Sequence, residues 1–83
     1  MNVTLKLYAS LDKFLPDGSE RNQATINIHE STTITALLDH HNVPREACHL
    51  VLLNGVFQPP AARPEIILTE GDAVAVWPPV AGG

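Results

Sequence analysis

The residues of this chain best suited to chemistry lie at its carboxyl end. The sequence closes with Pro78-Pro79-Val80-Ala81-Gly82-Gly83. Adjacent prolines favour a stiff, extended backbone and supply no N–H group for pairing in a sheet. Glycine has no β-carbon, so a segment that ends in two glycines fits a tunnel too narrow for other residues. The pattern predicts an extended probe whose reactive group is the carboxylate of Gly83.

The other reactive side chains have simpler interpretations. Cys48 and His49 are adjacent, and neighbours on a strand point to opposite faces, so they make a poor nucleophile and base. We interpret Cys48 as a small, partly buried apolar residue. His40 and His41 lie about 100° apart on a helix, which is poor geometry for a shared metal, and a helix end favours their positive charge. We expect no metal site. We interpret the serines as turn or cap residues: Ser10, Ser19 and Ser31.

Length and charge narrow the classes of function. The chain has 83 residues, which is one small domain. Its core can hold one sheet and one helix but cannot also enclose a large substrate pocket. The net charge is −4, from five basic and nine acidic residues. Because the basic residues form no stripe that could bind phosphates, we do not expect nucleic acid as a partner. We also do not expect an enzyme that acts alone.

The single cysteine and the first residues indicate a location. Cys48 has no second cysteine to form an internal disulfide with, which favours a reducing compartment. The opening MNVTLKLYAS lacks the apolar segment of a signal peptide. The apolar runs are far shorter than the roughly 20 residues that span a bilayer. We expect a cytoplasmic protein with no membrane partner.

Periodicity in the first half of the chain predicts two strands and a helix. Residues 3–9 and 24–28 alternate apolar and polar side chains, as half-buried strands do. Pro16-Asp17-Gly18 forms a turn between them, preceded by a short helical turn. The apolar stripe of Ile34, Leu37 and Leu38 predicts a helix over residues 33–41, with cap hydroxyls at residues 31–33.

The second half of the chain predicts three more strands. Residues 49–53 are mostly apolar, and Asn54-Gly55 is a strong signal for a hairpin that returns at residues 56–57. The proline-rich residues 58–65 predict a loop or an edge. Residues 73–77 form the last strand. The economical arrangement is one helix packed across a mixed sheet of about five strands, which is an α+β fold.

We place the first and last strands side by side at the centre of this sheet. If they are parallel, the fold is the β-grasp (ubiquitin-like) arrangement. The predicted organisation is a β-grasp domain over residues 1–77 and an extended diglycine tail over residues 78–83.

The ending resembles that of a known family. The segment VAVWPPVAGG at residues 74–83, preceded by Glu70-Gly71-Asp72, is similar to the MoaD/ThiS family of ubiquitin-like sulfur carriers. The opening VTLKLYASLDKFLP and the VLLNG at residues 51–55 also resemble that family. The double proline brings the chain nearer to the small subunit of molybdopterin synthase than to the thiamin-pathway branch. The proline-rich loop at residues 58–65 departs from the pattern of that subunit.

The resemblance implies a mechanism. An E1-like adenylyltransferase would use ATP to adenylylate the carboxylate of Gly83, and no cofactor would be bound by the chain itself. A sulfur donor such as a cysteine desulfurase system would convert the adenylate to a thiocarboxylate. The large subunit of molybdopterin synthase would then take up the tail and pass the sulfur to a pterin precursor of the molybdenum or tungsten cofactor. Physically, a tethered thiocarboxylate supplies a nucleophile without free sulfide.

The same resemblance assigns roles to the neighbouring residues. The residues expected to thread into the partner are Gly82, Ala81, Val80, Pro79 and Pro78. Trp77 and Phe57 are expected to be partner-binding aromatics. A core position for Trp77 remains an alternative. Other functions also stay open, because the same tail suits a sulfur carrier of another pathway, such as thiamin synthesis. It also suits a ubiquitin-like modifier that forms isopeptide bonds through Gly83. A third alternative is a binding module whose tail is inert.

Overall fold

The structure, a computed structural model, describes residues 1–79. It contains five strands, one α-helix and two 3-10 helices within this range. In chain order they are β1 Asn2–Leu7, η1 Ala9–Phe14, β2 Gln23–Asn27, α1 Ile34–His40, η2 Arg45–Ala47, β3 Leu50–Leu53, β4 Val56–Phe57 and β5 Ala73–Trp77. None of these helices is long and apolar enough to cross a membrane.

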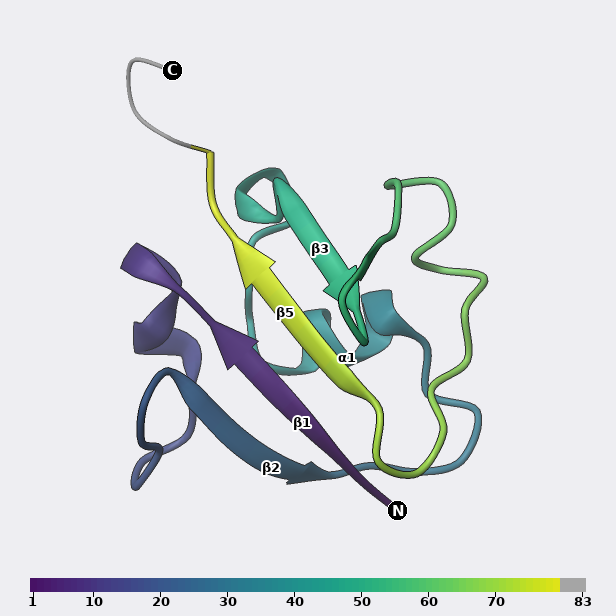
Figure 1. Ribbon diagram of the computed structural model, residues 1–83, viewed down its shortest axis with the longest axis horizontal. Coiled ribbons are helices and arrows are strands. Elements are labelled where there is room, and N and C mark those ends of the chain that lie inside the picture. Colours follow the sequence, from purple (N-terminus) through teal and green to yellow (C-terminus); the bar gives the residue numbers. More distant parts are fainter. Residues whose placement is uncertain (80–83) are drawn as a thin grey trace.

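The five strands form one mixed sheet in the order β2-β1-β5-β3-β4. β1 and β5 are parallel neighbours at its centre, with Leu5 level with Val74 and Leu7 level with Val76. The other three pairings are antiparallel. Figure 1 shows β1 and β5 running side by side, with α1 on the far side of the sheet. The predicted β-grasp arrangement, with the first and last strands parallel at the centre, is therefore confirmed.

The helix forms where the apolar stripe predicted it. Thr33 is the N-cap, and its side-chain oxygen accepts a hydrogen bond from the Ala36 N–H at 3.1 Å, which satisfies one of the free donors of the first turn. Ile34, Leu37 and Leu38 are buried against the sheet. They pack with the inward-facing residues of the central strands, chiefly Val3, Leu5, Leu7, Val51, Val74 and Val76.

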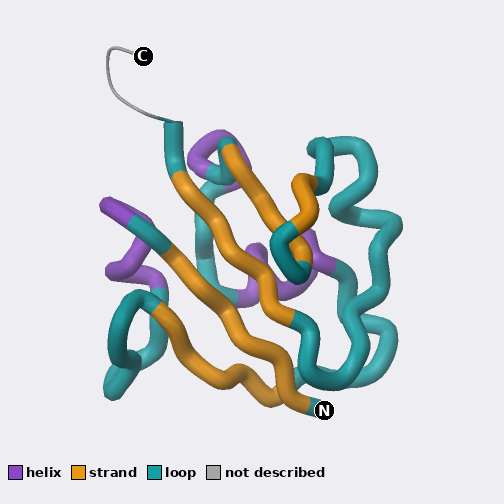
Figure 2. Tube along the Cα trace, in the orientation of Figure 1, coloured by secondary structure: helices purple, strands orange, loops and turns teal. Residues whose placement is uncertain are grey.

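The first strand ends earlier than the alternation predicted. β1 stops at Leu7, and Ala9 has a φ of 52°, which a continuing strand does not allow. The chain turns there into η1, which buries Leu11. Figure 2 shows this short helix at the same end of the sheet as the end of β5. The turn therefore leaves Tyr8 beside the last residues of β5.

Two turns at the opposite end of the sheet fix the start of β5. Asn54 Nδ2 donates to Asp72 Oδ1 at 3.0 Å, and the Ala73 N–H donates to Asn54 Oδ1 at 2.9 Å. Asp72 Oδ2 accepts from the Thr69 N–H at 2.8 Å. These bonds hold the pKa of the Asp72 carboxyl below its usual value, chiefly through the Asn54 amide and then through Thr69. The Asn54-Gly55 turn is thus joined to the first residue of the strand that carries the tail.

Candidate functional site

The base of the tail is the carboxyl end of β5. β5 is hydrogen-bonded on both sides, to β1 and to β3, and its middle residues are buried. At its last residue the Trp77 carbonyl accepts from the His49 N–H at 3.2 Å, and Trp77 is level with Leu50 of β3. Because neighbouring strands hold β5 up to this residue, the point at which the tail leaves the domain is fixed by the central sheet.

An aromatic stack stands at that point. The rings of Tyr8 and Trp77 lie 4.4 Å apart between centroids and within 9° of parallel. The Tyr8 N–H also donates to the Val76 carbonyl at 3.1 Å, so the backbone brings the two side chains together. Both rings are half-buried. Their exposed surfaces form an aromatic platform beside Pro78.

The platform continues across the face of the sheet that α1 does not cover. Alternation places Ala75 and Trp77 of β5 on this outer face, while Val74 and Val76 face the helix. The register then sets Leu52 level with Ala75 on one side and with Phe57 of β4 on the other. We call the following residues the outer patch: Tyr8, Leu50, Leu52, Phe57, Ala75 and Trp77.

The outer patch has the character of a docking surface. Phe57 is 49% exposed, which is unusual for a phenylalanine in a small domain. Leu50, Leu52 and Trp77 are half-buried, so each keeps apolar surface in contact with solvent. Lys6 of β1 is level with Ala75 of β5 and places a cation at the rim of the outer patch. A contiguous apolar area with a polar rim is typical of a protein-binding surface.

The structure places the predicted site residues as follows. Phe57 and Trp77 share the outer face, and the hydrogen-bonded register of β4, β3 and β5 connects them. Trp77 is not part of the buried core, so the alternative of a core position does not hold. Pro78 is half-buried and Pro79 is exposed, and neither belongs to a strand. The remaining predicted tail residues lie outside the described residues: Val80, Ala81, Gly82 and Gly83.

The histidines and the cysteine do not assemble a second reactive site. His40 ends α1 and His41 is its C-cap, with their rings edge to face at 5.4 Å. Cys48 is buried and its Sγ donates to the Pro44 carbonyl at 3.4 Å, whereas His49 is exposed. Burial raises the pKa of the Cys48 thiol, which keeps it protonated at neutral pH. Within residues 1–79 no three His, Cys, Asp or Glu side chains are placed to hold a metal ion.

Sequence reasoning missed two residues. Tyr8 lies within the predicted strand at residues 3–9, and no role was predicted for it. Its pairing with Trp77 could have been found, because two parallel central strands that end together bring their last outward residues side by side. Arg63 was counted only among the basic residues that form no stripe. It is only 6% exposed, and no pattern in the proline-rich loop signals this burial.

The solved structures that are similar to this chain include the following two. The first is the crystal structure of SAMP1 from Haloferax volcanii, with a TM-score of 0.67 and 23% sequence identity over 100% of both chains. The second is a complex of subunits 1 and 2 of molybdopterin-converting factor from Helicobacter pylori 26695, with a TM-score of 0.59 and 19% identity over 100% of both chains. At these identities the likeness concerns the fold. No curated protein matches the sequence.

The assignment to a family rests on the sequence itself. The model of the ThiS family matches residues 6–83, which include all of the outer patch, the proline pair and the diglycine ending. The fold agrees, since a five-stranded mixed sheet with one main helix is the ubiquitin-like β-grasp architecture. The chain belongs to the ThiS family of ubiquitin-like sulfur carriers.

Proposed function

We propose that this protein carries sulfur as a thiocarboxylate on Gly83 and donates it to the dithiolene of molybdopterin. An E1-like enzyme adenylylates the Gly83 carboxylate with ATP, and pyrophosphate leaves. The terminal sulfur of a persulfide on a donor of the cysteine desulfurase type then attacks the carbonyl carbon, displaces AMP and forms an acyl disulfide. A thiol reduces the S–S bond of this intermediate and is itself oxidised to a disulfide, which leaves the thiocarboxylate on Gly83. The single observation that carries the proposal is the family match over residues 6–83, which ends on the diglycine.

The fold supports a carrier in which partner enzymes supply the chemistry and this domain presents the reactive group. Adenylylation gives the carbonyl carbon of Gly83 a good leaving group, which a free carboxylate lacks. The domain contributes a handle: the β5 strand, held by two neighbouring strands, presents the tail from a fixed point at Trp77. A reactive group tethered to a docked handle reaches its acceptor at high effective concentration. The cytoplasm suits this chemistry, since a thiocarboxylate and the free thiol of Cys48 both persist under reducing conditions.

The proposed partner is the large subunit of molybdopterin synthase. The chain would dock its outer patch on that subunit and insert residues 78–83 toward the bound pterin precursor. One observation favours this pathway over thiamin synthesis: the Pro78-Pro79 pair, on which the resemblance to the small synthase subunit rests. The likeness in fold to a chain in the complex of two molybdopterin-converting factor subunits is compatible with docking on a second subunit.

The test is intact-mass spectrometry of the protein purified from its own cells. The expected species is heavier than the encoded chain by the difference between one sulfur and one oxygen atom. Deleting Gly83 should remove that species, while Thr25→Ala on the far strand β2 should leave it in place. Failure to detect the species in cells that make active molybdenum enzymes would contradict the proposal.

A second arm separates the acceptors. The thiocarboxylated protein is mixed with the large synthase subunit and the pterin precursor, and the dithiolene product is measured. Sulfur transfer only to a thiazole precursor would assign the carrier to the thiamin pathway instead. Adducts on lysine residues that depend on Gly83, found in cell lysates without any thiocarboxylate, would identify a protein modifier.

A further inference from the structure

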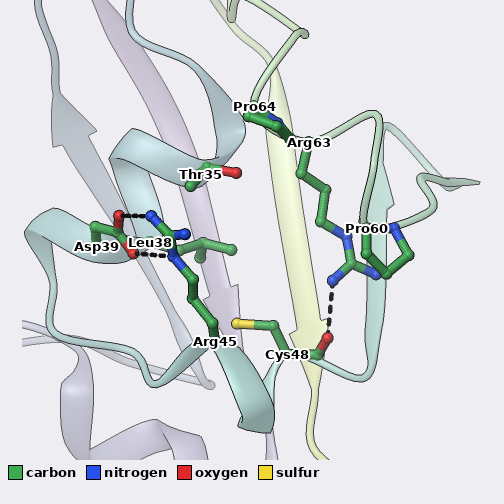
Figure 3. A pocket seen from close by; sticks show the side chains of 8 residues that line it. All are labelled: Thr35, Leu38, Asp39, Arg45, Cys48, Pro60, Arg63 and Pro64. Atoms are coloured by element: carbon green, nitrogen blue, oxygen red, sulfur yellow. Dashed lines mark hydrogen bonds and ion pairs between the residues drawn. The ribbon is translucent and has the colours of Figure 1, made fainter.

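A pocket lies away from the tail, between α1, η2 and the proline-rich loop. Its volume is about 350 Å³, which is near the lower end of the range for small-molecule sites. Leu38, Cys48, Pro60 and Pro64 supply apolar walls, and Thr35 adds a hydroxyl. Figure 3 shows these side chains around the opening, with Arg63 on one side and the Arg45–Asp39 pair on the other.

Arg63 is the unusual member of this lining. Among residues 1–79 it is the one charged residue that is buried, with 6% of its surface exposed. Its guanidinium donates to three backbone carbonyls, those of Gln58 at 2.9 Å, Cys48 at 2.8 Å and His49 at 3.4 Å. These bonds fix the side chain and pin the loop to the start of β3. A guanidinium nevertheless has more N–H donors than three bonds use.

No carboxylate among residues 1–79 neutralises the positive charge of Arg63. The one ion pair among residues 1–79 joins Arg45 to Asp39 at 2.7 Å, so Asp39 already has its partner. The Cys48 thiol cannot serve either, since its raised pKa keeps it uncharged at neutral pH. A buried cation without a counter-ion is costly. The same burial lowers the pKa of Arg63.

We propose that this pocket binds a small organic anion, a carboxylate carried on an apolar body, with Arg63 facing the carboxylate. The inference is independent of the tail and of its sulfur chemistry. Two guanidiniums and one carboxylate line the pocket, which leaves one net positive charge in a chain whose own net charge is −4. A monoanion matches that charge, and a planar carboxylate matches the geometry of a guanidinium.

The walls select the body of the ligand. Leucine, cysteine and proline side chains gain from contact with hydrocarbon, whereas a free phosphate ion would have to give up hydration against them. An aromatic or branched aliphatic carboxylate satisfies both parts of the pocket. Benzoate is a suitable probe, and benzamide is its neutral counterpart of nearly the same shape.

The test is an NMR titration of the full-length protein. Benzoate should cause saturable shifts of the Arg63 Nε–H and of the backbone amides of Thr35 and Cys48. Benzamide should bind at least several-fold more weakly, and inorganic phosphate should give no saturable shift at these positions. Equal binding of benzamide, or tighter binding of phosphate than of benzoate, would overturn the proposal.

Two variants with matched controls locate the site without disturbing Arg63. Thr35→Gln places a longer side chain in the pocket and should abolish benzoate binding, whereas Ala36→Gln on the exposed side of the same helix should not. Arg45→Gln removes the net positive charge of the lining and should weaken binding several-fold. Lys13→Gln makes the same charge change in η1, outside the pocket, and should have no effect. Unchanged binding in both pocket variants would refute the assignment.

Discussion

The ring of Tyr8 stacks on the ring of Trp77 at a centroid distance of 4.4 Å, where the two parallel central strands end. The residues are far apart in the sequence, and β-grasp topology alone brings them together. The stack occupies the outer face at the base of the tail. It therefore lies directly before the segment that ends in the diglycine.

The stack should contribute to stability beyond the area that it buries. A double-mutant cycle with Tyr8→Leu and Trp77→Leu should give a coupling energy of about 0.5–1.5 kcal/mol, the range of stacked aromatic pairs. The measurement is urea unfolding of the four proteins. Additive effects of the two substitutions would show that the rings are neighbours without energetic coupling.

Trp77 should be the dominant contact in docking. Truncation of a central aromatic in an interface commonly costs about 2 kcal/mol or more, so Trp77→Ala should weaken binding to the large synthase subunit on the order of 30-fold. Isothermal titration calorimetry measures this loss. Phe57→Ala should have a smaller effect in the same direction, because Phe57 lies at the edge strand. Thr25→Ala on β2 is the control and should bind like the unmodified protein; if it loses as much affinity, the docking face is misplaced.

The Asn54 side chain should hold the two turns together. Asn54 has a φ of 49°, so a substitution tests both its hydrogen bonds and its backbone conformation. Asn54→Gly keeps the conformation and should lose about 1–2 kcal/mol with the bonds to Asp72 and Ala73. Asn54→Ala should lose about 1 kcal/mol more, because alanine disfavours positive φ. Chemical denaturation gives the free energy of unfolding of each variant and so separates the effect of the hydrogen bonds from that of the backbone conformation. Equal stabilities of both variants would argue against strain at this position.

Leu37 should be a key core contact of the helix. It is 1% exposed against the inner face of the sheet, and Leu→Ala at such a site costs about 2–5 kcal/mol. Ala36→Ser on the exposed side of the same helix should change stability by far less. Thermal unfolding compares the variants, and an unchanged melting temperature for Leu37→Ala would mean that the helix does not pack as described.

Local patterns were enough to predict most of the fold. The Ile34, Leu37 and Leu38 stripe predicted a helix over residues 33–41, and α1 spans Ile34–His40. The last strand was predicted at residues 73–77, as observed. These elements bury one face, so their apolar residues recur in the sequence with the period of a helix or of a strand. The end of the first strand was placed two residues too late, because a positive φ at Ala9 leaves no mark in the alternation.

Contacts between distant segments were harder to predict. The outer patch needs the register of four strands, and a register depends on the whole sheet. Trp77 and Phe57 were proposed from the resemblance, whereas Tyr8 was not, although the predicted neighbouring strands could have indicated its pairing with Trp77. Arg63 shows the limit most clearly, since its bonds go to backbone carbonyls, which carry no sequence signature.

The C-cap of α1 should make stability depend on pH near neutrality. Nε2 of His41 is buried and has no hydrogen-bond partner among the described residues. Burial lowers the pKa of His41 from its ordinary value of 6.5, and the charge of neighbouring His40 lowers it further. As the pH falls through 6.5 the unfolded chain takes up this proton before the folded one does. The free energy of unfolding should therefore decline from that point until the pH reaches the lower pKa of the folded state.

The variant His41→Gln removes the titrating group and should flatten this decline. Urea unfolding between about pH 7.5 and about pH 5.5 covers the start of the window, since the slope with pH reports the proton uptake on unfolding. His29→Gln is the matched control, because His29 is exposed and lies beyond β2, away from the helix end. It should keep the slope of the unmodified protein. If His41→Gln also keeps that slope, the buried imidazole does not govern stability in this range, and proton uptake elsewhere must account for it.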